Sequence, residues 1–222
     1  MAQSTFRDFL REHLPPPPAR VLEIGCGQGE LTTALHVDGY EALGIDPLAP
    51  QGDLFRRVLL EDLDPGEGPF DAALAVQSLH HMRHLGDNLD RVVALLRPGG
   101  TLVVSEFGWD LADDATLDWL WNHRRALASA GGGEAPASFA EMRDDWEAEH
   151  VGLHRFEALR DEIAARFEER AFETAPFLYR KLRGVATTEV LEQALIEGGA
   201  IRALGFHYAG VARRRQGGAA AD

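Results

Sequence analysis

The sequence predicts an α/β fold in which a doubly wound, mostly parallel, seven-stranded sheet has helices on both faces. Short apolar runs alternate with amphipathic segments in the first half of the chain, as expected of buried parallel strands joined by crossover helices. The chain has 222 residues, of which 45% are hydrophobic and 26% are charged, so its composition is globular and its length allows a proper core. This length exceeds an average domain of roughly 150 residues, and we therefore expect one domain with a helical insert after the fifth strand.

Residues 1–19 are expected to form a short helix followed by a stiff linker. Apolar residues recur there at helical spacing, at Phe6, Phe9, Leu10 and Leu14. Four consecutive prolines, Pro15 to Pro18, then favour an extended polyproline conformation. Charged residues interrupt the apolar positions, so this segment lacks the continuous apolar core of a secretory signal.

Residues 20–107 carry the alternation itself and are expected to form the ligand-binding half of the sheet. The expected strands cover residues 20–24, 40–45, 57–60, 70–76 and 101–107. The expected helices cover residues 28–37, behind a glycine loop, and 86–96, which Pro98-Gly99-Gly100 brings to an end.

Residues 108–170 interrupt the sheet pattern with a largely helical, charged stretch, which we expect to form a cover over the substrate site. A flexible break is expected at Gly131-Gly132-Gly133, and the capping-box spacing of Ser138 and Glu141 predicts the start of a helix. Residues 171–212 are expected to complete the sheet, with strands at 172–182 and 200–212 around a helix at 188–197. Residues 213–222 begin with three arginines and are expected to form a disordered tail.

The charge balance and the cysteine content exclude several classes of partner. Lys and Arg total 22 against 36 Asp and Glu, and the resulting net charge of -14 repels nucleic acid and anionic membranes unless a basic patch overrides it. No stretch approaches the ~18 apolar residues of a membrane span. The lone cysteine, Cys26, excludes an internal disulfide and fits a reducing, cytoplasmic compartment. We expect a cytoplasmic monomer or homodimer that acts on a small molecule and binds neither nucleic acid nor membrane.

The most informative motif is the glycine loop after the first expected strand. Its glycines, Gly25, Gly27 and Gly29, let a ligand approach the backbone, and the following helix offers free N–H groups to an anion. A dinucleotide-binding loop needs a third glycine where Glu30 stands, and this carboxylate would repel a pyrophosphate. Glu23, two residues before the first glycine, instead suits a zwitterion with an ammonium for the acid and a carboxylate for the loop amides.

Acidic residues also follow the second and third expected strands. Asp46 stands where an acid can accept hydrogen bonds from both hydroxyls of a ribose. Glu61 and Asp62 stand where the exocyclic amine of an adenine would need an acceptor. Because the carboxyl ends of parallel strands share one edge of the sheet, these acids predict a single ligand crevice there.

The runs VLEIGCGQGE, GIDP, FDAALAVQSLHHM and LLRPGGTLVVSEF together resemble the class I S-adenosylmethionine-dependent methyltransferases, and within them the methyltransferase type 11/12 domain. The resemblance covers about residues 20–107 and extends to the terminal strands. It implies a Rossmann-like fold, S-adenosyl-L-methionine as cofactor and S-adenosyl-L-homocysteine as product. It also implies methyl transfer to an O, N or C atom of a small molecule, with bacterial secondary metabolism as one setting. A methyltransferase for RNA or protein, and a fold relative that binds the cofactor without methylating, remain alternatives.

The resemblance also implies roles for individual residues. Gly25 and Gly27 would contact the methionine part of the cofactor, Glu23 its amino group, and Asp46 the ribose. The short segment before the third strand leaves Glu61 and Asp62 as alternatives at the adenine edge, with Glu61 slightly favoured. The implied cofactor-binding residues are Glu23, Gly25, Cys26, Gly27, Asp46, Pro47, Glu61, Asp62, Leu63 and Gln77.

Methyl transfer requires alignment of a nucleophile with the methyl–sulfur axis and, for a hydroxyl or ammonium nucleophile, a base. The candidate catalytic residues are His80 and His81, which follow the fourth expected strand, and Glu106, which ends the fifth. A packing or backbone-holding role for either histidine stays equally open.

Other kinds of site are less well supported by the sequence. Adjacent histidines such as His80 and His81 diverge, and His150 and His154 flank Gly152 in a polar stretch, so we expect no metal site. Cys26 lacks a base partner in the sequence. Ser78 lacks the glycines of a nucleophile elbow.

Overall fold

The computed structural model describes residues 5–182 and 188–213, and it divides into two compact units. The sheet unit comprises Met1–Ser105, Leu159–Phe172 and His207–Asp222, and the insert unit comprises Glu106–Ala158 and Glu173–Phe206. The segment 159–170, which was expected in the insert, therefore groups with the sheet, and most of 171–212 groups with the insert.

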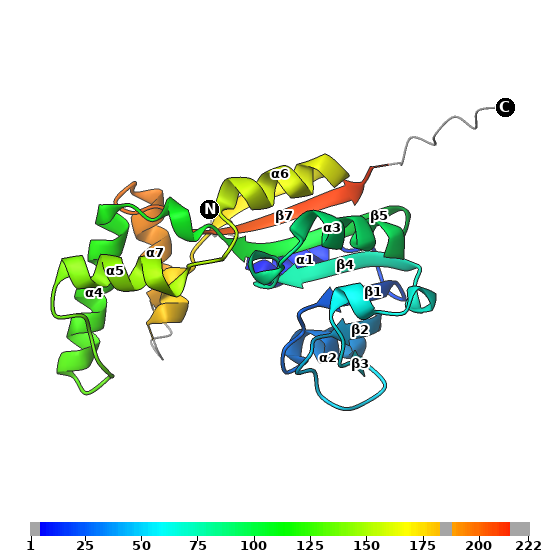
Figure 1. The fold of residues 1–222 in the computed structure, drawn as a ribbon, viewed down its shortest axis with the longest axis horizontal. Helices are drawn as coiled ribbons and strands as arrows, with labels where there is room; N and C mark the ends of the chain where they lie inside the picture. Colours follow the sequence, from blue (N-terminus) through cyan, green and yellow to red (C-terminus); the bar gives the residue numbers. More distant parts are fainter. Residues whose placement is uncertain (1–4, 183–187, 214–222) are drawn as a thin grey trace. The chain divides into compact units, whose positions relative to one another are not determined.

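The sheet has seven strands in the order β3-β2-β1-β4-β5-β7-β6, which confirms the expected doubly wound α/β fold (Figure 1). The strands are β1 (Arg20–Ile24), β2 (Glu41–Ile45), β3 (Phe55–Arg56), β4 (Phe70–Val76), β5 (Leu96–Phe107), β6 (Phe167–Ala175) and β7 (Gly205–Ala212). Strand β1 pairs in parallel with β2 and β4, and the pairs β2–β3 and β4–β5 are parallel as well. The last three strands, β5, β6 and β7, run from one unit into the other.

Helices cover both faces of the sheet unit. The helices are α1 (Phe6–His13), α2 (Glu30–Val37), α3 (Leu85–Leu95) and α6 (Phe156–Arg166). Phe9 and Leu10 of α1 and Leu35 of α2 pack in one core cluster with Val21 of β1 and Leu74 of β4. Figure 1 shows α3 and α6 on the other face, with α6 running along β7. Both faces of the central strands are thus buried, which explains their nearly continuous apolar sequences.

The insert unit contains the helices α4 (Asp114–Ser129), α5 (Phe139–Glu149) and α7 (Thr188–Glu197), with one short 3-10 turn before α4 and another before α7. The expected break at the glycine run lies between α4 and α5, where Gly131 and Gly133 adopt positive φ. Ser138 caps α5 as expected, since its hydroxyl accepts the N–H of Glu141 at 3.1 Å. The core of this unit combines leucines with aromatic side chains, notably Trp146 and Phe177.

Two expected strands were misplaced. Residues 57–60 are not a strand, because the edge strand β3 pairs only through Phe55 and Arg56, and a 3-10 turn, η1 (Leu60–Asp62), follows. The strand expected at 172–182 is instead β6, which ends at Ala175, and the 3-10 turn η5 (Leu178–Lys181) follows. Pro176 has no N–H for a strand partner, which accounts for the end of β6.

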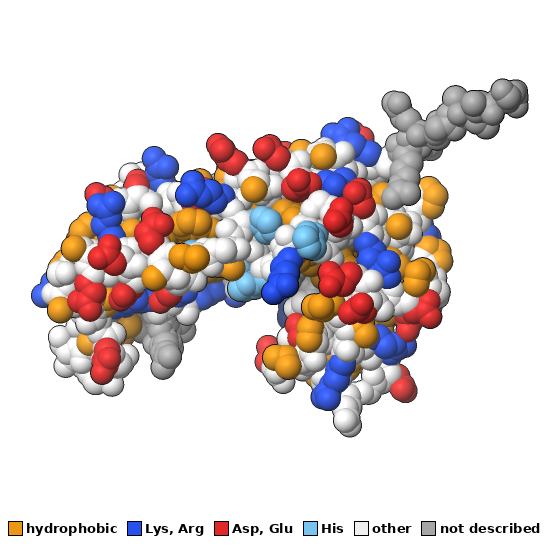
Figure 2. Space-filling view, in the orientation of Figure 1, with side chains coloured by type: hydrophobic (Ala, Val, Ile, Leu, Met, Phe, Trp, Pro, Cys, Tyr) orange, Lys and Arg blue, Asp and Glu red, His pale blue; other side chains and the backbone are white. Residues whose placement is uncertain are grey.

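Other boundaries shift by a few residues. The last strand begins at Gly205 rather than near residue 200, because α7 ends with Gly199 in the left-handed conformation. Arg213 continues from β7, its N–H donating to the carbonyl of Arg166 at 2.9 Å, and the rest of the expected tail lies outside the described residues. Within the described ranges, no helix is long and apolar enough to cross a membrane. Acidic and basic side chains are interspersed on the face drawn in Figure 2.

Candidate functional site

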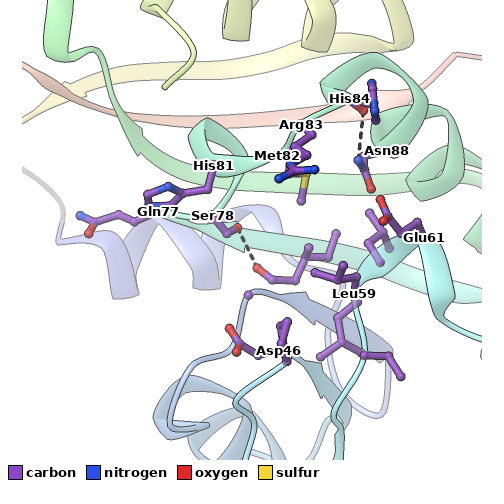
Figure 3. Close-up of a pocket in the computed structure, with 16 residues that line it drawn as sticks. Asp46, Leu59, Glu61, Gln77, Ser78, His81, Met82, Arg83, His84 and Asn88 are labelled. Atoms are coloured by element: carbon purple, nitrogen blue, oxygen red, sulfur yellow. Dashed lines mark hydrogen bonds between the residues drawn. The ribbon is translucent and has the colours of Figure 1, made fainter. Parts of the chain in front are cut away.

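A cavity of about 500 Å³ lies in the sheet unit, where β1, β2 and β4 end (Figure 3). This volume falls in the range of ~300–1,000 Å³ that is usual for small-molecule sites. Four segments line the cavity: Ile24 and Gly25; Ile45, Asp46 and Pro47; Val58, Leu59, Leu60 and Glu61; and Gln77, Ser78, His81, Met82, Arg83, His84 and Asn88. The carboxyl edge of a parallel sheet is where ligands bind in open α/β folds.

The glycine loop leaves β1 in a conformation that only glycine adopts easily. Gly25, Gly27 and Gly29 have φ values of +77°, +51° and +77°. A Cβ at Gly25 would lie 2.5 Å from the Cβ of Ser78, whose hydroxyl donates to the carbonyl of Ile24 at 2.8 Å. A Cβ at Gly27 would meet no atom within 4 Å. The loop is therefore packed on one side at Gly25 and open to a ligand at Gly27.

Asp46, at the end of β2, connects this loop to the cavity. Its carboxylate accepts the N–H of Gly27 at 3.2 Å and the N–H of Leu48 at 2.7 Å. The same side chain lines the cavity (Figure 3), as does the following Pro47. Asp46 thus holds the glycine loop in place and also forms part of the cavity wall.

Three expected cofactor contacts, Glu23, Cys26 and Gly27, are not among the residues that line the cavity. Glu23 is 4% exposed, and its carboxylate accepts a hydrogen bond from the hydroxyl of Thr32. Burial raises the pKa of Glu23, and the bond from Thr32 opposes this effect. Burial, together with the charges of Glu23 and Asp46, raises the pKa of Cys26 to about 12. The Cys26 thiol is therefore protonated and a poor nucleophile at neutral pH.

The turn η1 decides which acid after β3 faces the cavity. Glu61 lines it, whereas Asp62 and the buried Leu63 do not. Arg91 of α3 holds the turn, because its Nε donates to the carbonyl of Leu60 at 2.6 Å and its Nη2 donates to the carbonyl of Leu63. The structure thus places Glu61, the favoured alternative, in the cavity wall.

Gln77 directly follows β4 in an unusual conformation. It has a φ of +50°, which costs a residue with a side chain of the order of 1 kcal/mol, and its N–H donates to the carbonyl of Ser105 at 2.8 Å. Gln77 is among the residues that line the cavity. Such strain beside a cavity is typical of a functional position.

The candidate catalytic residues do not all reach the cavity. His81 lines it, while His80 is buried, with its ring centroid 4.1 Å from that of His81. Glu106 belongs to the insert unit, where it is 2% exposed and its carboxylate accepts the N–H of Phe107 at 3.3 Å. His81 is therefore the one candidate for which the cavity supplies direct access to a ligand.

Sequence reasoning missed several residues of the cavity wall, above all Arg83, His84 and Asn88. A usable signal was present at Asn88, a polar residue on the apolar face of α3 that is 7% exposed and whose amide donates to the carbonyl of His84 at 3.0 Å. Ser78 had been considered only as a nucleophile, whereas its contact with Gly25 gives it a packing role.

With this geometry in place, comparison with known proteins assigns the chain to a family. Residues 2–173 match the model of the methyltransferase domain. The chain belongs to this methyltransferase family. The match confirms the resemblance to the class I enzymes that the glycine loop and the acidic strand ends had indicated.

The curated relatives match only part of this family member. A ubiquinone biosynthesis O-methyltransferase of Bradyrhizobium sp. (strain ORS 278) is 35% identical over 99 residues, which cover 39% of each chain. A tRNA U34 carboxymethyltransferase of Hahella chejuensis is 34% identical over 108 residues, which cover 41% of this chain and 33% of the relative. The matched part thus spans well under half of these relatives.

Solved structures share the fold over most of the methyltransferase-family chain. An S-adenosylmethionine-dependent methyltransferase of Mesorhizobium loti has a TM-score of 0.57 at 18% identity, covering 91% of this chain and 95% of the other. The 1,6-didemethyltoxoflavin-N1-methyltransferase of Burkholderia thailandensis has a TM-score of 0.51 at 19% identity, covering 89% and 72%. The [4+2]-cyclase SpnF has a TM-score of 0.54 at 20% identity, covering 94% and 80%. At these identities the likeness concerns the fold alone.

Proposed function

We propose that this chain is an S-adenosyl-L-methionine-dependent methyltransferase that acts on a small molecule. The observation that carries the proposal is the cavity at the ends of β1, β2 and β4, which is lined by Gly25 of the glycine loop and by the carboxylates of Asp46 and Glu61. Family membership over residues 2–173 supports it.

The residues of the cavity fit the proposed cofactor. Asp46 would accept hydrogen bonds from the ribose hydroxyls, and Glu61 would accept one from the adenine amine. The open backbone at Gly27 would receive the methionine part, beside Gly25 and Gln77. Pro47 completes this wall. We assign supporting roles behind it to the remaining implied contacts, which are Glu23, Cys26, Asp62 and Leu63.

When bound, the cofactor supplies a methyl group that its sulfonium has already activated. The protein then has to align the acceptor and exclude water. We assign His81 to proton removal from a hydroxyl or ammonium acceptor, because it lines the cavity together with Gln77 and histidine is the side chain most often used as a general base. The ring of His80, which packs against that of His81 at an interplanar angle of 44°, would hold it in place. For Glu106 a catalytic role stays a prediction.

A small-molecule acceptor is favoured over RNA by the net charge of -14 and by the interspersed charges in Figure 2. The relative from Burkholderia thailandensis is named for a small-molecule acceptor, and the one from Hahella chejuensis for a tRNA. Binding of RNA that weakens steeply with salt would contradict our assignment. Roles in secondary metabolism, a cytoplasmic location and a monomeric or homodimeric state remain predictions.

A second candidate function is cofactor binding without methyl transfer. The observation that favours it is the shared fold of SpnF, a relative whose name describes cyclisation. Incubation with a methyl-labelled donor and a panel of phenols, amines and carbon acids separates the two functions. Labelled product supports methyl transfer, whereas tight cofactor binding without any labelled product favours the second function.

Calorimetric titration with S-adenosyl-L-homocysteine and, separately, with NAD tests the proposed cofactor. We expect binding of the first and none of the second, because Glu30 stands where a pyrophosphate loop needs glycine. Tighter binding of NAD would refute the proposal.

A further inference from the structure

The cavity has one wall that carries cationic and imidazole groups and others that carry acids. His81, Arg83 and His84 belong to the segment after β4, whereas Asp46 and Glu61 follow β2 and β3. Figure 3 shows Arg83 reaching in between His81 and Asn88, with Asp46 on the opposite side. Arg83 is the one arginine among the residues that line this cavity.

Arg83 differs from most other arginines in having no partner within the described part of the chain. Arg91 donates to two carbonyls, and Arg166 pairs with Asp90 and Glu162. Arg83 and the surface residue Arg7 alone among the described arginines make no hydrogen bond, ion pair or ring contact. An exposed guanidinium at a cavity wall, without an internal carboxylate, is free to contact a ligand.

The chemistry of the cavity indicates which part of the proposed cofactor Arg83 can contact. The proposed cofactor carries no phosphate, and its carboxylate is assigned to the glycine loop. The part nearest Glu61 is then the adenosine half, which offers a flat purine face. A planar, weakly hydrated guanidinium stacks well on such a face, and the apolar residues Val58 and Leu59 are available on another wall.

We propose that Arg83 covers the adenosine half of the bound cofactor, with its guanidinium stacked on the purine ring. This inference rests on the proposed function and adds a specificity-determining residue to it. It explains why an arginine lines a cavity with two carboxylates but has no ion-pair partner there.

The test compares the variants Arg83→Ala and Arg83→Lys with the matched control Arg7→Ala, which also removes an exposed, unpartnered arginine. Each is titrated with S-adenosyl-L-homocysteine and with methylthioadenosine, which has the adenosine half without the amino acid. Arg83→Ala should weaken both ligands by the same factor, about 3- to 30-fold, as expected for a cation–π contact. Arg83→Lys should lose most of the same affinity because an ammonium has no plane to stack. Arg7→Ala should bind like the wild type.

Three results would overturn the inference while leaving the proposed function intact. They are unchanged binding of both ligands to Arg83→Ala, weakened binding of S-adenosyl-L-homocysteine alone, and full affinity in Arg83→Lys. Unchanged binding of both ligands, combined with slower methyl transfer to an anionic acceptor, would show that Arg83 contacts the acceptor instead of the cofactor. Failure of the wild type to bind S-adenosyl-L-homocysteine would refute the proposed function itself. Thermal unfolding followed by circular dichroism should be the same for all variants, because Arg83 and Arg7 are exposed.

Discussion

The two units of the molecule bury different kinds of side chain. The core of the sheet unit consists mainly of aliphatic residues on successive strands, such as Val21 and Leu74. The core of the insert unit combines leucines with aromatic residues, and all four tryptophans of the chain lie in or against it: Trp109, Trp119, Trp121 and Trp146. The strand residues of the first core belong to continuous apolar runs, whereas the tryptophans of the second are scattered through a charged, largely helical stretch.

The units also use carboxylates differently. In the sheet unit, Asp46 accepts two backbone N–H groups and still lines a cavity. In the insert unit, Glu192 of α7 is 0% exposed and accepts the N–H groups of Phe177, Leu178 and Tyr179 at 2.8, 2.9 and 2.7 Å. Both acids organise backbone, but only Asp46 is accessible to a ligand. The comparison suggests that accessibility, more than the number of hydrogen bonds, distinguishes a binding acid from a structural one.

The largest effect is expected from Glu192→Ala. This change leaves three backbone N–H groups without the carboxylate that accepts their hydrogen bonds. It should therefore lower the free energy of unfolding of the insert unit by roughly 3–5 kcal/mol. Tryptophan fluorescence during denaturant unfolding measures this unit alone, since it holds every tryptophan. Cofactor binding in the sheet unit should persist under native conditions. The control Glu189→Ala removes an exposed acid from the same helix and should change little.

The stability of the insert unit should also depend on pH through Glu192. Burial raises the pKa of Glu192 above its usual value of 4.5, although its backbone hydrogen bonds oppose this shift. The folded carboxyl then binds its proton more tightly than the unfolded one. Its contribution is fully present below the unfolded pKa and declines as the pH rises through the folded pKa. Glu192→Ala should remove this decline, and an unchanged pH profile in the variant would contradict the assignment.

The next prediction compares Gly25, which is packed against Ser78, with Gly131, which has open space around it. Gly25→Ala introduces a Cβ 2.5 Å from Ser78 at a φ of +77°, and it should destabilise the sheet unit by about 2–4 kcal/mol. It should also abolish measurable binding of S-adenosyl-L-homocysteine. Gly131→Ala, at a φ of +80° with no atom within 4 Å, should cost only the strain of about 1–2 kcal/mol and leave binding unchanged. Equal losses of stability would show that conformation, rather than contact with Ser78, governs Gly25.

A smaller effect is expected at the end of β2. Asp46→Ala should weaken binding of S-adenosyl-L-homocysteine by about 1–3 kcal/mol, because ribose hydroxyls lose a charged acceptor and the N–H of Gly27 loses its partner. Asp53→Ala is the matched control, since Asp53 is exposed and contributes only its backbone carbonyl, to Arg56. Calorimetric titration of both variants with S-adenosyl-L-homocysteine measures the two losses of affinity. If the two losses are similar, Asp46 is not the ribose acceptor.

The sheet unit was largely predictable because its signals are local. Strands β1, β2 and β4 are apolar runs beside turn residues, and the loop around Gly25 and Gly27 follows the first of them. The position of Asp46 in the cavity wall follows from the rule that parallel strands end at one edge of the sheet.

The parts of the fold and of the cavity wall that were not predicted depend on contacts between different elements, which the spacing of residues in the sequence does not show. Residues 58–60 have the composition of a strand, but the short pairing of β3 leaves them in the cavity wall and in a turn that Arg91 holds from α3. Arg83 lines the cavity only because the chain after β4 turns back over it. The turn at Phe177 depends on Glu192, which lies beyond it in sequence. Periodicity in the sequence does not predict which residues make these contacts between different elements.

The smallest effect concerns the glycine run of the insert unit. We expect limited proteolysis to cut first at residues 131–137, an exposed connection between α4 and α5 in which Gly131 and Gly133 have open space around them. Two hydrogen bonds oppose cleavage there, from the indole of Trp121 to the carbonyl of Pro136 at 2.9 Å and from the N–H of Ala137 to the carboxylate of Glu141 at 2.6 Å.

If the insert covers the substrate site, S-adenosyl-L-homocysteine together with an acceptor should slow this cleavage a few-fold and change the tryptophan fluorescence. Strands of the sheet unit should resist the protease throughout, because they are buried. Cleavage at the same rate with and without ligands, and with unchanged fluorescence, would make the insert a rigid scaffold. The aromatic core around Trp146 would then serve packing alone.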